Sequence, residues 1–318
     1  MGESRTEEGV MPSSLFLFDT PDPEKEQVVS VRPDMVRMAA IVSYRGTAYR
    51  GFAEQPSGEQ VAKYLRIALS TIFQEELQIS CAGRTDVGVH AIGQVISFDV
   101  ARRVARSRLE RSIARLLPSD IGVSWIGEAS STFDARHSAK FRRYIYRVST
   151  VRGTVGPVDG LVWSLGQEVD LAAIRNGALS LVGHYDFAAF CKSQRGEPRP
   201  TRREVFDVDV AASDLGFDIS IVANSFCQQM CRGIVGLLAE VGIGKRPASD
   251  VWRVLQGGRR SDLGRIAPPD GLYLYRVGYG EAPRRVSLAE HPFRFAPPHP
   301  EEVFGSMFSG FPKGMQDG

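Results

Sequence analysis

The chain has 318 residues, of which 43% are hydrophobic and 24% charged, and its formal net charge is +2. Such a composition is typical of a globular protein with a buried core. No apolar run approaches the ~20 residues that a membrane-spanning helix needs, so a helical membrane protein is excluded and a cytoplasmic protein is expected.

The charge is distributed unevenly along the chain. Residues 1–35 are net acidic and residues 281–318 nearly balanced, which leaves 32 basic against 24 acidic residues in 36–280. A basic body favours an anionic partner such as a nucleic acid. Residues 1–35 are polar and proline-containing, which predicts a disordered extension. Residues 281–318 are interpreted as a second tail, docked in part through Phe293, Phe295 and Phe304.

Cysteine spacing gives no sign of a metal site. Cys227 and Cys231 would share one face of a helix, but two further zinc ligands are missing nearby. A disulfide framework is unusual in a chain of this length, so buried free thiols are predicted at all four cysteines, which include Cys81 and Cys191. No dinucleotide or flavin fingerprint occurs, and no cofactor is expected.

Between the tails, segments with helical periodicity alternate with segments typical of strands. Up to residue 150 we expect strands at Met38–Tyr44, Gln78–Ala82, Gln94–Val100, Ile121–Ile126 and Phe141–Ser149, and helices at Gln60–Leu77 and Ser107–Leu117. After Pro157 we expect strands at Leu161–Leu165, Glu204–Val210, Phe217–Val222 and Leu272–Tyr279, and helices at Leu171–Leu181, Phe226–Gly242 and Ala248–Gln256. Helices set between strands in both parts predict an α+β fold of two similar α/β sandwich halves, 36–150 and 151–280.

The stretch "CAGRTDVGVHAIGQV" is dense in residues with special chemistry. Gly83 and Gly88 enclose a loop that holds Arg84 and Asp86, and glycine allows a backbone to turn and to approach a ligand closely. The carboxylate of Asp86 is either a turn-forming group or one presented to a substrate, and the guanidinium of Arg84 favours the second interpretation. His90 is interpreted as a hydrogen-bonded support for the loop, because no nucleophile motif accompanies it.

Two basic segments could contact a nucleic acid. The strand "KFRRYIY" places Arg142 and Tyr144 on one face, which is either a base-stacking surface or the core side of an amphipathic strand. The arginines of a glycine- and proline-containing loop, Arg195, Arg199, Arg202 and Arg203, either reach for phosphates or are solvated.

The predicted helix Phe226–Gly242 carries glycines on one side and an apolar face on the other. Gly233 and Gly236 each cost about 1 kcal/mol relative to alanine, which indicates that backbone packs closely against that side. Arg232 projects from the same side and could reach a carboxylate or form a surface ion pair.

Together these segments resemble the tRNA pseudouridine synthase A family, bacterial enzymes that act on the tRNA anticodon stem-loop. The resemblance rests on "GRTDVGVHAIGQV", "FDARHSAKFRRYIYRV", "ANSFCQQMCRGIVGLLAEVG" and "APPDGLYLYRVGY", which span Met38–Tyr279 in the family's order. It implies an isomerase that converts uridine to pseudouridine at tRNA positions 38, 39 and 40. It also implies a homodimer in which two halves share an extended antiparallel sheet with a central active-site cleft.

The resemblance assigns a role to four residues. Asp86 falls at the catalytic aspartate, Tyr144 at the tyrosine that packs on the target uracil, and Arg232 at the arginine that pairs with the aspartate. Arg84 falls at a loop arginine that helps to displace the base. The chain departs from the family pattern at Phe52 and Ala53, in the loop Cys191–Arg202, and at Cys227, Gln228 and Gln229.

The chemistry needs few groups. Breaking the N1–C1′ bond and rejoining the uracil through C5 involves no redox change, so one carboxylate can act as nucleophile or stabilise charge at C1′. A guanidinium beside the carboxylate favours its charged form. The rival functions are a non-catalytic RNA-binding protein and a hydrolase. A hydrolase would need a second acid, or a metal with several carboxylates, near Asp86. The acid pair Asp207 and Asp209 is expected to be solvent-exposed.

Overall fold

The computed structural model describes residues 34–153, 156–192 and 200–305, apart from the side chain of Arg106. Nearly all of the predicted N-terminal extension, the middle of the loop Cys191–Arg202 and the end of the predicted C-terminal tail lie outside these residues.

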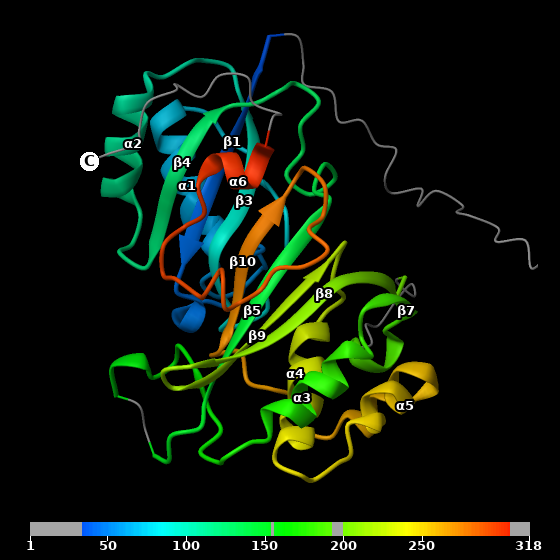
Figure 1. Ribbon diagram of the computed structural model, residues 1–318. Helices are drawn as coiled ribbons and strands as arrows, with labels where there is room; N and C mark the ends of the chain where they lie inside the picture. Colours follow the sequence, from blue (N-terminus) through cyan, green and yellow to red (C-terminus); the bar gives the residue numbers. More distant parts are fainter. Residues whose placement is uncertain (1–33, 154–155, 193–199, 306–318) are drawn as a thin grey trace, which may run out of the picture.

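One sheet of ten strands runs through the described residues (Figure 1). Eight strands follow the order β4-β1-β3-β10-β5-β9-β8-β7, while β2 pairs with β3 and β6 with β5. Their bounds are β1 Val36–Tyr44, β2 Ser80–Cys81, β3 His90–Val100, β4 Ile121–Glu128, β5 Phe141–Ser149, β6 Trp163–Ser164, β7 Gly183–Asp186, β8 Arg202–Ser213, β9 Gly216–Ala223 and β10 Leu272–Gly278. Neighbouring strands are antiparallel except for β3 with β10 and β5 with β6.

Six α-helices and four short 3-10 helices complete the described part. The α-helices are α1 Val61–Phe73, α2 Arg106–Leu116, α3 Leu171–Leu179, α4 Met230–Gly242, α5 Ser249–Gly257 and α6 Pro300–Phe304. The 3-10 helices are η2 Gly46–Ala48, η3 Gly156–Val158, η4 Ala188–Phe190 and η5 Arg260–Leu263. The predicted fold class, a mixed fold on a large, mostly antiparallel sheet, is therefore confirmed.

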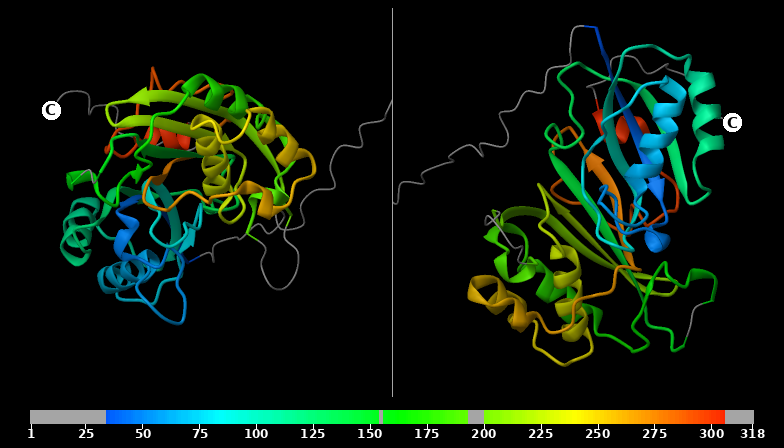
Figure 2. Two further views of the ribbon diagram at one scale, coloured as in Figure 1. Left: turned by 90° about the horizontal axis from the view of Figure 1, so that it is seen from below. Right: turned by 180° about the vertical axis from the view of Figure 1, so that it is seen from behind.

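Both faces of the N-terminal part of the sheet are covered. Helices α1 and α2 lie on one face of β4, β1 and β3, and α6 lies on the other (Figures 1 and 2). Helix α1 buries one side, formed by Val61, Ala62, Leu65, Ala68, Leu69 and Phe73. Because neither face meets water, β1 and β3 are buried along nearly their whole length, including the polar side chains of His90, Gln94 and Ser97.

The C-terminal segment after β10 docks through Phe293 and Phe304, as the sequence predicted, whereas the predicted Phe295 is 57% exposed. Phe304 is buried and packs against Trp125 and Tyr279, with ring centroids 4.9 and 5.6 Å apart. Phe293 packs on Tyr273, and the guanidinium of Arg147 lies over its ring. The docked segment extends the core onto the second face of the sheet.

The acid pair on β8 anchors the same segment. The carboxylates of Asp207 and Asp209 accept hydrogen bonds from the backbone N–H groups of Val286 and Leu288 at 2.9 and 2.6 Å. Both aspartates are half-buried, so the prediction that they are solvent-exposed was wrong. Their alternation along the strand correctly placed them on one face, but it could not reveal that distant chain covers that face.

Strand β10, from the C-terminal part of the chain, lies between two strands of the N-terminal part. It inserts between β3 and β5, pairing Tyr273 with His90 on one side and with Ile145 on the other. This brings the start of β3, which follows the loop with Asp86, beside elements that come after residue 151. None of the helices in the described ranges has the length and apolarity required to cross a membrane.

Candidate active site

The loop Gly83–Gly88 is held from several sides before any substrate arrives. The side chain of Gln94 spans Gly83, accepting from its N–H at 3.2 Å and donating to its carbonyl at 2.6 Å. The Thr85 hydroxyl forms a hydrogen bond with the Tyr44 hydroxyl at 2.8 Å, and the Thr85 carbonyl accepts one from the Phe52 N–H at 3.2 Å. The backbone that carries Asp86 is therefore fixed by neighbouring elements, as a preorganised site requires.

The two glycines of the loop have different tasks. Gly88 has a φ of +79°, in the left-handed region that favours glycine, and a Cβ there would lie 2.8 Å from Pro269. Gly83 does not have a left-handed backbone conformation, and a Cβ there would lie 3.6 Å from the Tyr144 hydroxyl. Gly88 thus makes the turn, whereas Gly83 lies beside Tyr144.

Asp86 faces the start of α4. Its Oδ2 lies 4.0 Å from Nη1 of Arg232, and its Oδ1 accepts from the Gln228 amide at 3.4 Å. The Asp86 side chain is 24% exposed and that of Arg232 is 15% exposed, so solvent screens the pair only in part. The structure therefore brings together the carboxylate and the guanidinium that the sequence predicted to pair.

Arg232 is oriented by the segment that leads into β10. Its Nε donates to the Ala267 carbonyl at 2.7 Å, and the Ala267 N–H donates to the Arg232 carbonyl at 3.1 Å. Close packing makes this contact possible, because a Cβ on Gly236 would lie only 1.9 Å from the Arg265 carbonyl oxygen. The backbone contact predicted from the helix glycines is confirmed.

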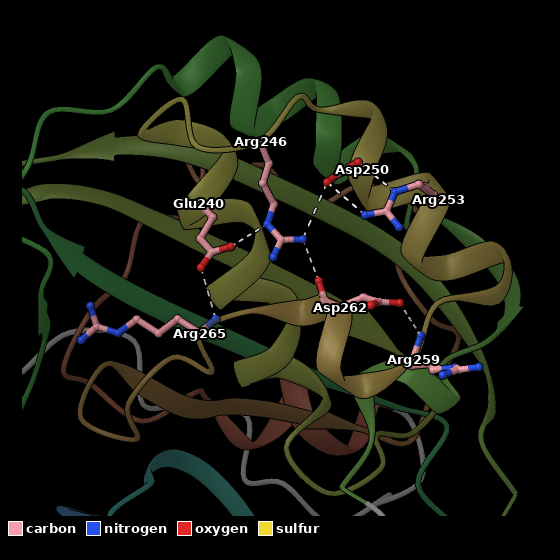
Figure 3. A network of polar contacts seen from close by, with 7 residues as sticks. All are labelled: Glu240, Arg246, Asp250, Arg253, Arg259, Asp262 and Arg265. Atoms are coloured by element: carbon pink, nitrogen blue, oxygen red, sulfur yellow. Dashed lines mark hydrogen bonds and ion pairs between the residues drawn. The ribbon is translucent and has the colours of Figure 1, made fainter.

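A network of ion pairs holds that segment against α4 (Figure 3). The carboxylate of Glu240 accepts from the Arg265 N–H at 3.2 Å and from Arg246 Nε at 2.6 Å. Arg246 also donates to the Asp262 carbonyl at 2.7 Å. The network fixes residues 262–265 and thereby supports the carbonyl that orients Arg232.

Tyr144 lies beside the loop Gly83–Gly88 on the central strand β5. It is 8% exposed, and its ring meets that of Phe226 edge to face, with centroids 4.9 Å apart. Burial raises the pKa of the Tyr144 phenol well above its usual value, and the nearby charge of Asp86 adds to that shift. The hydroxyl therefore stays protonated at neutral pH, close to the Asp86 carboxylate.

Arg84 lies on the other side of the loop. Its side chain is exposed and lines a cavity of about 750 Å³ together with Cys81, Asp134 and Arg136. This cavity does not reach Asp86 or Tyr144. The structure thus groups Asp86, Tyr144 and Arg232, and it places Arg84 at the edge of that group.

His90 supports the loop, as interpreted from the sequence. Its Nδ1 accepts from the Gly46 N–H at 3.0 Å and its Nε2 lies 3.0 Å from the Asp270 carbonyl. Nε2 therefore carries the proton of the neutral ring. Burial lowers the pKa of His90 to about 4, so the ring is neutral at pH 7.

Arg142 is a structural residue. The strand β5 lies in the middle of the sheet, and the Arg142 guanidinium is buried against backbone carbonyls, including those of Ala82 at 2.9 Å and Asn224 at 2.8 Å. Of the two interpretations of "KFRRYIY", Arg142 therefore supports the core side. It links β5 to Ala82, just before the loop Gly83–Gly88, and to the chain before α4.

The sequence assigned no site role to three polar residues, of which Gln228 contacts Asp86 directly. Besides Gln228, these are Gln229, whose side-chain oxygen accepts from Arg260, and Arg260 itself, which also donates to the Phe190 carbonyl at 3.1 Å. Gln229 has a φ of +64°, a left-handed conformation that costs about 1–2 kcal/mol outside glycine. No periodic pattern marks such residues, although a polar "QQ" inside an apolar helix pattern was a weak signal.

The prediction of four free thiols was wrong for one pair. Cys191 and Cys227 form a disulfide, with Cα atoms 5.5 Å apart, while Cys81 and Cys231 are free. The two bonded cysteines are 36 residues apart, and folding brings the end of η4 against the chain before α4. Among the described residues, no three His, Cys, Asp or Glu side chains gather as a metal site.

The structure thus places a carboxylate beside a guanidinium, an amide and a protonated phenol, which are groups that an enzyme acting on a polar, anionic substrate can use. The family model described as "tRNA pseudouridine synthase" matches residues 40–138 and 178–280. The chain belongs to the tRNA pseudouridine synthase family, isomerases that convert uridine to pseudouridine in tRNA.

Individual relatives agree with the family model. The chain is 36% identical over 246 residues to tRNA pseudouridine synthase A of Rhodopseudomonas palustris (strain BisB18), an alignment of 77% of this chain and 100% of that protein. It is 35% identical over 266 residues to tRNA pseudouridine synthase A of Shouchella clausii (strain KSM-K16), covering 80% of this chain and all of the relative. The similarity to the enzyme of Thermoanaerobacter sp. (strain X514) is 32% over 245 residues.

Proposed function

We propose that Asp86 is the nucleophile of a tRNA pseudouridine synthase that acts on the anticodon arm, with Arg232, Tyr144 and Arg84 as substrate-binding residues. The observation that carries the proposal is the grouping of Asp86 with Arg232 at 4.0 Å and with the phenol of Tyr144 near Gly83. Asp86 and Tyr144 come from the chain before residue 150 and Arg232 from the chain after it, which supports a site between the two expected halves, 36–150 and 151–280.

The reaction conserves atoms and electrons. The N1–C1′ bond breaks, the detached uracil turns, and a C5–C1′ bond forms, while the C5 proton is lost and N1 gains one. Asp86 supplies the electron pair that bonds to the substrate and takes it back when the new C–C bond is complete. Arg232 stabilises the carboxylate before attack and after release, since a guanidinium favours the anion.

The target uridine must leave its stack to reach Asp86, at a cost of a few kcal/mol. Tyr144 offers the aromatic face on which the flipped uracil packs. Arg84, exposed at the edge of the loop, occupies the gap that the base leaves. A binding protein without catalysis would need neither the fixed loop nor the half-buried pairing of Asp86 with Arg232, and this function is not favoured.

The decisive experiment compares wild type and Asp86→Asn on an unmodified tRNA transcript, with pseudouridine mapped by carbodiimide-dependent reverse-transcription stops. We expect stops in the anticodon arm with wild type and at least a 10³-fold slower reaction with Asp86→Asn, because the amide cannot act as a nucleophile. Full activity of Asp86→Asn would remove Asp86 from the mechanism. Modification only outside the anticodon arm would refute the proposed target. The homodimer stays a prediction, which sedimentation equilibrium tests.

A further inference from the structure

The segment around α2 concentrates positive charge. Residues 101–116 contain six arginines and one glutamate, a net of +5. Residues 36–280 together have 32 basic and 24 acidic residues, a net of +8. Most of the surplus charge of the folded body thus lies on this one segment, at the outer edge of the sheet beside α1 (Figure 1).

Two of the six arginines have clear structural partners. Arg102 donates to the Gln74 side chain and to the Ile72 carbonyl, both at 3.1 Å, and so ties the segment to the end of α1. Arg103 forms an ion pair with Glu128 at 2.8 Å. These contacts account for their presence.

Three other arginines form a stripe on the solvent side of α2. Arg108, Arg111 and Arg115 are exposed and make no hydrogen bond or ion pair with any described residue. Their spacing of three and four residues places them on one side of the helix. Leu109 and Ile113, which are buried, lie on the opposite side. We call Arg108, Arg111 and Arg115 the arginine stripe.

The stability of α2 does not explain the arginine stripe. Like charges three or four residues apart on a helix repel one another. The first turn of α2 contains no acidic residue and has no side-chain cap, so basic residues there also oppose the helix dipole. Arg115 in the last turn favours the dipole, but Arg108 in the first turn opposes it and the three charges repel one another, so helix stability does not account for the stripe as a whole.

We propose that the arginine stripe binds the sugar–phosphate backbone of the tRNA outside the anticodon arm. A row of guanidinium groups matches a row of phosphates, each able to accept two hydrogen bonds from one arginine. A membrane surface is disfavoured, because the apolar side of α2 is already buried against the protein. The inference rests on the proposed function, since it places the anticodon arm at Asp86.

The position of α2 supports contact beyond the anticodon arm. The loop Gly83–Gly88, which carries Asp86, precedes β3. The 11 residues of β3 lead towards the start of α2. At about 3.3 Å per residue in β3 and 1.5 Å in α2, the stripe lies on the order of 20–30 Å from the loop along the strand direction. RNA that contacts both places must extend well past the nucleotides that surround the target uridine.

The test uses full-length enzyme with all three arginines of the stripe replaced by glutamine, and two substrates: a tRNA transcript and its isolated anticodon stem-loop. We expect KM for the tRNA to rise about tenfold, and the slope of log Kd against log salt to fall by about 2, as loss of two to three phosphate contacts predicts. The kinetics of the stem-loop should stay at the wild-type level, and so should kcat at saturating tRNA.

The matched control replaces the exposed Arg284, Arg285 and Arg294 of the C-terminal segment by glutamine, with the same change of charge. An equal rise in KM in this control, or an equal rise in KM for the stem-loop, would overturn the proposal. An unchanged KM of the stripe variant for tRNA would also overturn it, and would leave an acidic protein as the candidate partner. Circular dichroism verifies folding. Wild-type inactivity on both RNAs would instead refute the proposed function.

Discussion

Arg232 performs two tasks with one guanidinium. The Nε of Arg232 donates a hydrogen bond to the Ala267 carbonyl, which leaves its Nη1 directed at Asp86. A lysine has a single charged nitrogen on a flexible stem and could not keep both contacts in the same geometry. The residue identity at this position is thus set by orientation as much as by charge.

His90 predicts a pH dependence of stability. Its pKa is about 4 in the folded protein, against an ordinary value of 6.5, because the ring is buried. Between those values the unfolded chain binds more protons, so stability should fall as pH drops from about 6.5 to 4, by about 3 kcal/mol at most. Urea unfolding at a series of pH values measures this.

The variant His90→Gln isolates that contribution. It should be less stable than wild type at pH 7, because the Gly46 N–H and the Asp270 carbonyl lose their hydrogen-bond partner. Because glutamine does not titrate, the stability of the variant should also fall less steeply below pH 6.5. A slope identical to that of wild type would show that other groups cause the acid sensitivity.

Single residues differ in how far sequence predicts them. Asp86, Tyr144 and Arg232 occur in motifs whose spacing relates them to a known family, so their grouping could be anticipated. Gln228 and Arg260 could not be found, because their meaning arises only when the chain before α4 meets η5. Arg142 was ambiguous because a strand has two faces, and only burial shows which face meets the core.

At the scale of elements, α4 shows where periodicity is misleading. Its apolar pattern extends back to Phe226, yet the helix begins at Met230. The Gln228 carbonyl accepts from the Lys192 N–H at 2.8 Å and Gln229 is bonded to Arg260, so tertiary contacts hold both residues in a turn. Local propensity for helix is weaker than these contacts.

The contact between α4 and the segment before β10 can be tested with Gly236→Ala. Its new Cβ would meet the Arg265 carbonyl, so backbone must shift, and we expect a loss of about 1–3 kcal/mol in the free energy of unfolding. Activity should also fall, because the shift displaces the Ala267 carbonyl that orients Arg232.

Gly257→Ala in α5 is the matched control, since nothing lies within 4 Å of a Cβ there. It should be neutral or more stable by up to about 1 kcal/mol, as alanine is the better helix former. If Gly236→Ala proved as stable as Gly257→Ala in urea, the close packing at Arg265 would be disproved.

At the scale of the whole molecule, the disulfide links two distant parts of the C-terminal half. Alkylation of unfolded protein without reductant should label only Cys81 and Cys231, whereas prior reduction should expose all four thiols. Closing a loop of this length stabilises a protein by about 2–4 kcal/mol, so reductant should lower the free energy of unfolding by that amount.

Cys191→Ser should reproduce the effect of reductant, and reductant should have no further effect on that variant. Labelling of four thiols in the purified, unreduced protein would show that Cys191 and Cys227 are not bonded.

The sequence alone determined the class of fold, the order and type of most elements, and the residues that we propose carry the chemistry. Those features depend on local periodicity, glycine chemistry and short motifs, which are properties of neighbouring residues. Only the tertiary structure decided that β10 inserts between β3 and β5, that Cys191 meets Cys227, and which arginines are buried, paired or exposed. These outcomes depend on contacts between residues far apart in the chain, and no local pattern encodes which distant segment will cover a given face.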